Sequence, residues 1–249
     1  MRASQVYRWI ESCAGWLWPP RCVLCGGCGR LPDYDLCAAC EAEFPLVSMP
    51  CARCGLPRAA LTATEPGDGC DRCRALDLPY ARCLAPWAYE FPVTRLVQAL
   101  KYEGALANAR ILGSQIAAVA GPALCALSRE QAPPLLVPMP LHPSRLIERG
   151  FNQSGEIARI VARRLELRLA EAALHRTRAT APQVGLARHE RAGNLKGAFA
   201  ADARVVAGRA VILVDDVVTT GSTVAEAART LLEARATTVH VWAAARVPG

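Results

Sequence analysis

Four CxxC pairs near the start of the chain restrict its fold more than any other feature of the sequence. A CxxC turn places two thiolates on one side of a tight bend, and two such turns can surround a zinc ion tetrahedrally with Zn–S bonds of about 2.3 Å. The inner gaps of the two consecutive quartets, 11 and 15 residues, suit zinc ribbons. The sequence therefore predicts one or two structural zinc ions bound by Cys22, Cys25, Cys37, Cys40, Cys51, Cys54, Cys70 and Cys73.

The other four of the twelve cysteines leave some choices open. Cys28 forms an overlapping CxxC with Cys25 and could replace a ligand of the first pair, and the spacing also permits crosswise sharing between the quartets. A single CxxC could be a redox pair, but four pairs within 52 residues favour metal binding. Cys13, Cys83 and Cys125 lie among apolar neighbours and are predicted to be small buried residues. A site of four thiolates has no open coordination position, so the predicted role is structural.

The first 20 residues predict a short amphipathic helix. Glu11 interrupts what would be the apolar region of a signal peptide, and no small-residue cleavage site follows it. No window approaches the roughly 18 consecutive apolar residues that a membrane helix needs. We therefore expect a cytoplasmic protein without a membrane span, in a compartment that keeps cysteines as free thiols.

After a boundary at residues 76–80, apolar strand-like runs alternate with amphipathic helix-like runs. Strands are predicted at residues 82–91, 135–140, 210–218 and 237–246, and helices at 92–104, 105–121, 153–167 and 223–235. Fully apolar strands that alternate with helices are typical of an α/β fold, in which a parallel sheet is covered on both faces. Ligands in such sheets bind beyond the carboxyl ends of the strands.

The run VILVDDVVTTGST, residues 211–223, ends one of these strands with two carboxylates and a hydroxyl-rich turn. The turn precedes a predicted helix, whose free backbone N–H groups favour a phosphate. Asp215 and Asp216 would repel that phosphate unless they contact another, hydroxyl-bearing part of the same ligand. A sugar phosphate has both parts, so it is the favoured ligand. A Mg²⁺ site on the two aspartates, or a simple helix cap, is the weaker alternative.

This run resembles the 5-phosphoribosyl-1-pyrophosphate (PRPP) motif of type I phosphoribosyltransferases at every position. Together with PPRCVLCG, ALKYEG, VPMPLHPSRLIERGFNQS and TAPQVGLARHERAGNLKGAF, it resembles the competence protein F (ComF, including GntX-like) family over nearly the whole chain. The resemblance implies a double zinc ribbon at residues 21–78 and a phosphoribosyltransferase-like domain at 79–249. It also implies a link to natural competence, the uptake of DNA and its inward passage as a single strand.

Carried over to this sequence, the resemblance makes Asp215 and Asp216 the catalytic ribose contacts. The remaining PRPP-binding residues that it implies are Arg145 and Arg149 for the pyrophosphate, and Val217, Thr219, Thr220, Gly221, Ser222 and Thr223 for the 5′-phosphate. Mg²⁺ is expected to accompany PRPP. Residues 176–199 lack a regular period and resemble the flexible loop that closes over such sites, with Gln183, Arg188, Arg191, Asn194 and Lys196 as its candidate contacts. A solvated charge at Arg149 and a basic linker in place of the loop are the alternative interpretations.

Two functions fit these features. The first is a protein that binds PRPP and handles single-stranded DNA. It fits residues 142–196, which hold 11 Lys or Arg against 5 Asp or Glu, a local charge of +6, although Arg159, Arg163, Arg164 and Arg168 are read as a solvated helix face. The alternative is a phosphoribosyltransferase that transfers ribose 5-phosphate from PRPP to an unknown nitrogen acceptor. Proteins of the competence machinery are further expected partners. The exposed aromatic rings that single-strand binding favours are not expected, because the sequence predicts core positions for Trp87, Tyr89, Phe91 and Tyr102.

Overall fold

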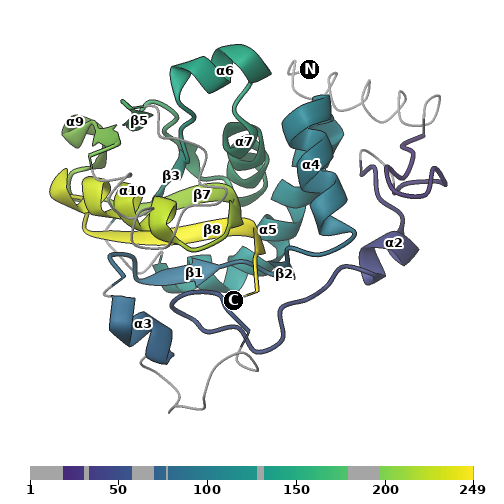
Figure 1. Ribbon diagram of the computed structural model, residues 1–249, viewed down its shortest axis with the longest axis horizontal. Helices are drawn as coiled ribbons and strands as arrows, with labels where there is room; N and C mark the ends of the chain where they lie inside the picture. The colour runs from purple at the N-terminus through teal and green to yellow at the C-terminus, as the bar shows by residue number, and fades with distance from the viewer. Residues whose placement is uncertain are drawn as a thin grey trace, which may run out of the picture.

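The computed structural model describes residues 19–30, 34–57, 70–76, 78–127, 132–178 and 197–248 of the chain. An α/β architecture is present, as predicted, with a mostly parallel sheet in the order β1-β8-β7-β3-β4 and with β2 also paired to β8 (Figure 1). The strands are β1 (Arg82–Leu84), β2 (Trp87–Ala88), β3 (Leu135–Pro138), β4 (Arg168–Leu169), β7 (Ala210–Val218) and β8 (Thr238–Arg246). All the strand pairs of this sheet are parallel.

The centre of the sheet consists of β7 and β8, whose apolar sequences are buried along almost their full lengths. Alternate residues of a strand point to opposite faces. In β7, Val211 and Leu213 therefore pack into one hydrophobic cluster, while Ile212 and Val214 pack into another on the other face. A strand buried on both faces cannot alternate apolar and polar residues, which explains the continuous apolar run in the sequence.

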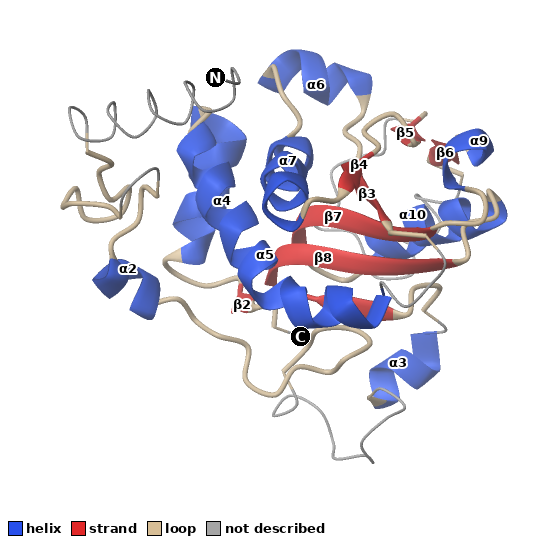
Figure 2. Cartoon of the chain, turned by 180° about the vertical axis from the view of Figure 1, so that it is seen from behind, coloured by secondary structure: helices blue, strands red, loops and turns tan. Residues whose placement is uncertain are grey.

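Helices cover both faces of this sheet. The helices α4 (Val93–Glu103), α5 (Leu106–Leu127) and α7 (Gln153–Leu165) cover one face, and α10 (Ser222–Glu233) covers the other (Figure 2). Within the described ranges, no helix joins the length to the apolar character that crossing a bilayer requires.

The two cysteine-rich segments lie apart, one near each end of the sheet. The short helices α2 (Ala38–Ala42) and α3 (Asp71–Leu76), which belong to these segments, are well separated in both ribbon views. Cys22 belongs to the hydrophobic cluster that includes residues of α4 and α5. Cys51 and Cys54 belong to the hydrophobic cluster that includes residues of α10. The two segments therefore contact opposite sides of the same sheet.

Several short elements were not predicted. The first strand ends at Leu84, well before the predicted end at residue 91. A helix, α6 (Pro143–Arg149), follows β3 and carries both predicted pyrophosphate arginines; proline suits its first turn, and Gly150 ends it in the left-handed region at φ 80°. The remaining short elements are β5 (Leu174–Arg176), β6 (Phe199–Ala201) and α9 (Ala203–Val206).

The prediction of buried aromatic rings is only half right. Trp87 and Tyr89 pack against the core, but Phe91 and Tyr102 are each 76% exposed. Phe91 precedes α4, and Tyr102 shares the outer face of that helix with Arg95 and Gln98. The apolar stripe of α4 turns toward the core, so a ring on the opposite side of the helix cannot reach it.

Gly113 of α5 lies against α7 so closely that a side chain would not fit. A Cβ atom there would be 2.7 Å from Cβ of Ile160 and 2.9 Å from the carbonyl oxygen of Ile157. Gly113→Ala is therefore expected to lower the free energy of unfolding by about 1–3 kcal/mol, measured by chemical denaturation. Gly121→Ala, in open space on the same helix, is the control and is expected to stabilise by up to about 1 kcal/mol. Equal effects of the two changes would contradict this packing.

Candidate functional site

The hydroxyl-rich turn lies at the carboxyl end of β7 and leads directly into α10. Gly221 has φ 87°, a left-handed conformation that glycine adopts without strain, and Ser222 begins the helix. The hydroxyl groups of Thr220 and Ser222 lie 3.1 Å apart, and Thr219 is exposed. The first N–H groups of an α-helix have no partner within the helix. The turn therefore presents backbone N–H and side-chain hydroxyl groups together at the surface.

The two carboxylates directly before this turn are buried, at 8% exposure for Asp215 and 4% for Asp216. Asp215 Oδ1 accepts hydrogen bonds from Ser154 Oγ at 3.0 Å and from the backbone N of Asp216 at 2.9 Å. Asp216 Oδ1 accepts one from the backbone N of Val217 at 2.9 Å, and Asp216 Oδ2 forms an ion pair with Lys101. A buried charge is tolerated when it is paired and hydrogen-bonded, and both conditions are met here.

Burial and mutual repulsion set the electrostatics of this pair. Burial, and after it the neighbouring carboxylate of Asp216, raises the pKa of Asp215 to about 8. Burial, the largest single effect, lowers the pKa of Lys101, but the charge and hydrogen bond of Asp216 together with the charge of Asp215 raise it overall. The ligand-free site therefore keeps the lysine charged and favours a proton on Asp215 near neutral pH.

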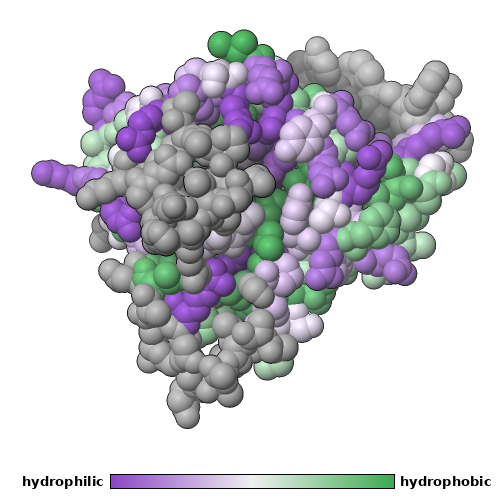
Figure 3. Space-filling model, in the orientation of Figure 1, coloured by the Kyte–Doolittle hydropathy of each residue, from purple (hydrophilic) through white to green (hydrophobic). Residues whose placement is uncertain are grey.

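The two predicted pyrophosphate arginines lie on α6 and have different surroundings. No residue of α6 is buried, and the space-filling view shows hydrophilic side chains in its region together with an exposed apolar group at the top (Figure 3). Arg149 Nη1 donates a hydrogen bond to Gln153 Oε1 at 2.6 Å. Arg145 is exposed, and its charge adds to the effect of burial in lowering the pKa of Arg176. Arg145 and Arg176 therefore bring positive charge to the same side of the site.

The five predicted loop contacts, Gln183, Arg188, Arg191, Asn194 and Lys196, lie outside the described residues. The segment that contains them begins and ends at an antiparallel ribbon, in which Leu174 pairs with Ala201 and Arg176 with Phe199. The backbone N of Gly197 donates a hydrogen bond to Glu226 Oε1 of α10 at 2.8 Å. The described end of this segment is thus anchored to the helix that follows the hydroxyl-rich turn.

The thiols of the four CxxC pairs gather into two tetrads formed by the consecutive quartets. One tetrad is Cys22, Cys25, Cys37 and Cys40, and the other is Cys51, Cys54, Cys70 and Cys73; within each, all sulfur atoms lie within 4.8 Å of one another. A zinc ion with four Zn–S bonds of about 2.3 Å requires sulfur–sulfur distances of about 3.8 Å. The sulfurs of Cys25 and Cys37 lie 3.8 Å apart, and those of Cys54 and Cys70 lie 3.7 Å apart. Both donor sets therefore fit a structural zinc ion.

The remaining described cysteines stay outside the tetrads. Cys28 is exposed and belongs to neither group. Cys83 is buried, as predicted, but the prediction for Cys125 is wrong because its side chain is exposed. Cys125 follows Pro122 near the end of α5, on the side that faces away from the sheet, and a local apolar sequence could not reveal that orientation.

A buried arginine joins the second tetrad to the hydroxyl-rich turn. Arg246, at the end of β8, donates from Nε to the carbonyl of Cys54 at 2.9 Å and from Nη1 to the carbonyl of Val218 at 2.7 Å. A further hydrogen bond reaches the carbonyl of Thr219. The hydroxyl of Tyr80 lies 3.6 Å from the Cβ position of Gly221. Arg246 therefore connects the backbone of the second tetrad to the backbone of the hydroxyl-rich turn.

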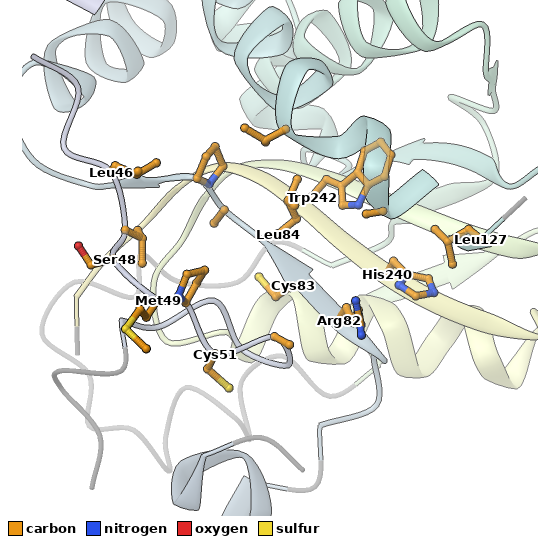
Figure 4. A pocket seen from close by; sticks show the side chains of 17 residues that line it. Leu46, Ser48, Met49, Cys51, Arg82, Cys83, Leu84, Leu127, His240 and Trp242 are labelled. Carbon is orange, nitrogen blue, oxygen red and sulfur yellow. The ribbon is translucent and has the colours of Figure 1, made fainter. Parts of the chain in front are cut away.

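An apolar cavity of about 660 Å³ lies elsewhere, at the β1 edge of the sheet (Figure 4). The segment from Leu46 to Ala52, strand β1 and the last turns of α5 line it, with His240 and Trp242 of β8. Neither aspartate lines this cavity. It belongs to the contact between the second cysteine segment and the sheet, and it is separate from the site at the carboxyl ends of the strands.

Sequence reasoning missed three residues of the site, Lys101, Ser154 and Arg246, which contact the carboxylates or the turn. Arg176 is the first residue of the predicted loop segment, and burial and the charge of Arg145 lower its pKa. The sequence held one signal for Lys101. This lysine directly follows Leu100, the last buried residue of α4, so it begins next to the core side of the helix.

Comparison with known proteins matches both parts of the chain. Residues 13–74 match the double zinc ribbon domain, and residues 152–248 match the phosphoribosyl transferase domain. The DNA utilization protein YhgH of Escherichia coli O6:H1 is 36% identical over 232 residues, which cover 92% of this chain and 97% of that protein. Competence protein F of Haemophilus influenzae is 28% identical over 229 residues, which cover 91% and 96% of the two chains.

The two tetrads predict two zinc ions per chain, measured by elemental analysis of the purified protein. Cys70→Ala with Cys73→Ala leaves two thiols in the second tetrad, too few to hold the ion, so one zinc ion per chain is expected. Cys125→Ala removes a cysteine outside both tetrads and is expected to retain two zinc ions. Two zinc ions in the double variant would contradict the assignment.

Proposed function

The chain belongs to the family of competence protein F and the DNA utilization proteins, and from this premise we propose that it binds PRPP and handles incoming single-stranded DNA. The proposed site is the carboxyl end of β7, where Asp215 and Asp216 meet the turn of residues 219–223. We place the protein in the cytoplasm, where its cysteines remain thiols available to zinc.

One observation carries this proposal: two buried carboxylates lie directly beside a surface turn that offers N–H and hydroxyl donors. The carboxylates can accept hydrogen bonds from ribose hydroxyls, and the turn can donate to a 5′-phosphate. A ligand with only one of these groups would leave half of the site unused. A ribose phosphate supplies both groups at once.

The surrounding residues fit the rest of the PRPP molecule. Arg145 and Arg176 provide positive charge for the pyrophosphate, and Mg²⁺ bound to the pyrophosphate would neutralise more of its charge. Lys101 holds Asp216 in place and offsets its charge. Arg246 bonds to the carbonyls of Val218 and Thr219, which supports a turn that is already shaped for a phosphate.

Transfer to a nitrogen acceptor is a second candidate function. The charge of Arg145 and Arg176 that would bind the pyrophosphate could also stabilise it as a leaving group.

Asp215→Asn with Asp216→Asn is expected to abolish PRPP binding measured by calorimetry in the presence of Mg²⁺. An amide lacks the charge and half of the acceptor capacity that the ribose hydroxyls would use. The zinc content should stay at two ions, because neither aspartate belongs to a tetrad. Asp202→Asn is the control, because this residue caps α9 and asparagine caps a helix equally well. Full PRPP affinity in the double variant would remove these residues from the site.

PRPP binding is also expected to release a proton at pH 7. The free protein favours the protonated form of Asp215, whose pKa is about 8, whereas hydroxyl donors favour the carboxylate. Affinity should therefore rise between pH 7 and 9 and then level off. Calorimetry in buffers of different ionisation enthalpy counts the released protons. Affinity that falls over this range would show that Asp215 is not deprotonated by the ligand.

A further inference from the structure

Tyr102 presents its ring to solvent immediately beside the proposed site. It is 76% exposed, follows Lys101 on α4, and faces away from the buried stripe of that helix. A single exposed ring is common on protein surfaces, so its neighbours decide whether it can serve in binding. Its position next to the lysine that pairs with Asp216 makes it a candidate for binding.

A fixed guanidinium group accompanies this ring. The Cζ atom of Arg149 lies 5.7 Å from the centroid of the Tyr102 ring, within the range of a cation–π contact. The hydrogen bond from Arg149 to Gln153, a residue only 6% exposed, holds the guanidinium in this place. The pair thus offers an aromatic face and a positive charge side by side.

A continuous series of contacts connects Tyr102 and Arg149 to the two carboxylates. Lys101 pairs with Asp216, and its neighbour Asp215 accepts a hydrogen bond from Ser154. Gln153, the residue before Ser154, accepts a hydrogen bond from Arg149, and Arg149 lies against Tyr102, the residue after Lys101. Because this series of contacts is short, Tyr102 borders the site that contains the two aspartates.

We propose that Tyr102 and Arg149 form a stacking platform for an unpaired base of single-stranded DNA, with Arg149 also meeting the adjacent phosphate. This inference rests on the proposed function in one respect, that the protein handles single strands. The chemistry of the pair selects the ligand, because a nucleotide combines an aromatic face with a negative charge. The bases of a duplex are already stacked on each other, so only an unpaired base can use the platform.

The equally exposed Phe91 provides a matched control. It precedes α4, whereas Tyr102 lies in the last turn, and no guanidinium contact is found at its ring among the described residues. Removal of either ring deletes a similar exposed aromatic surface. Only the removal of Tyr102 should affect DNA binding if the platform is real.

The test measures fluorescence anisotropy of a labelled oligothymidylate with the zinc-loaded protein. Tyr102→Ala is expected to weaken binding about 5- to 150-fold, the usual effect of losing one stacked base. Tyr102→Phe retains the ring and should bind within about threefold of the unmodified protein. Phe91→Ala should bind as the unmodified protein does, and a labelled duplex should not respond to Tyr102→Ala.

The dependence on salt separates the two members of the pair. Tyr102→Ala removes no charge, so the slope of log affinity against log salt should stay the same. Arg149→Gln removes one phosphate contact and should reduce that slope by about 0.7. An unchanged slope for Arg149→Gln would overturn the part of the proposal that assigns Arg149 to a phosphate.

Calorimetry with PRPP on the same preparations distinguishes this inference from the proposed function. Tyr102→Ala is expected to keep full PRPP affinity. Undiminished oligonucleotide binding by Tyr102→Ala, an equal loss in Phe91→Ala, or no DNA binding by the unmodified protein would overturn the platform whatever the PRPP result. Loss of PRPP binding in Tyr102→Ala would also overturn it, by making the ring part of the phosphoribosyl site. If the unmodified protein bound no PRPP but Tyr102→Ala weakened DNA binding, the PRPP proposal would fail and the platform would stand.

Discussion

The guanidinium group of Arg246 connects parts of the molecule that the sequence keeps far apart. It is buried and donates to the carbonyl of Cys54, 192 residues earlier in the chain, and to the carbonyls of Val218 and Thr219. A charged group can stay in the interior only while its donors have partners. The same side chain therefore bonds directly to the backbone of the second cysteine segment and to the backbone at the start of the hydroxyl-rich turn.

The two tetrads consequently have different roles in the fold. The second tetrad is buried beside β1 and belongs to the hydrophobic cluster that includes α10. Its metal would therefore stabilise the part of the core that lies next to the proposed site. The first is partly exposed, and hydrogen bonds and ion pairs from α5 hold its segment, among them Gln115 to Tyr34 and Arg110 to Asp35. The first tetrad therefore joins its segment to the helical layer over the sheet, whereas the second belongs to the core beneath the proposed site.

Local patterns explain why much of this arrangement could be predicted. The apolar runs predicted the central strands, and the CxxC spacing predicted the eight ligands although it left their grouping open. The hydroxyl-rich turn was recognisable because all its parts are consecutive. The partners of the carboxylates were not predictable in this way. Ser154 bonds a carboxylate 61 residues away, and only the folded sheet brings the two together. The exposure of Tyr102 was a different error, since its helical phase with Arg95 and Gln98 was available in the sequence.

The most direct test of the central claim is a crystal structure of the zinc-loaded protein with PRPP and Mg²⁺. The account predicts electron density for the 5′-phosphate at residues 219–223 and for the ribose hydroxyls at Asp215 and Asp216. The second tetrad should hold a metal ion, seen by anomalous scattering, with Arg246 still bonded to Cys54. PRPP bound elsewhere, for example in the cavity at the β1 edge, or a turn without phosphate density at saturating PRPP, would contradict the account.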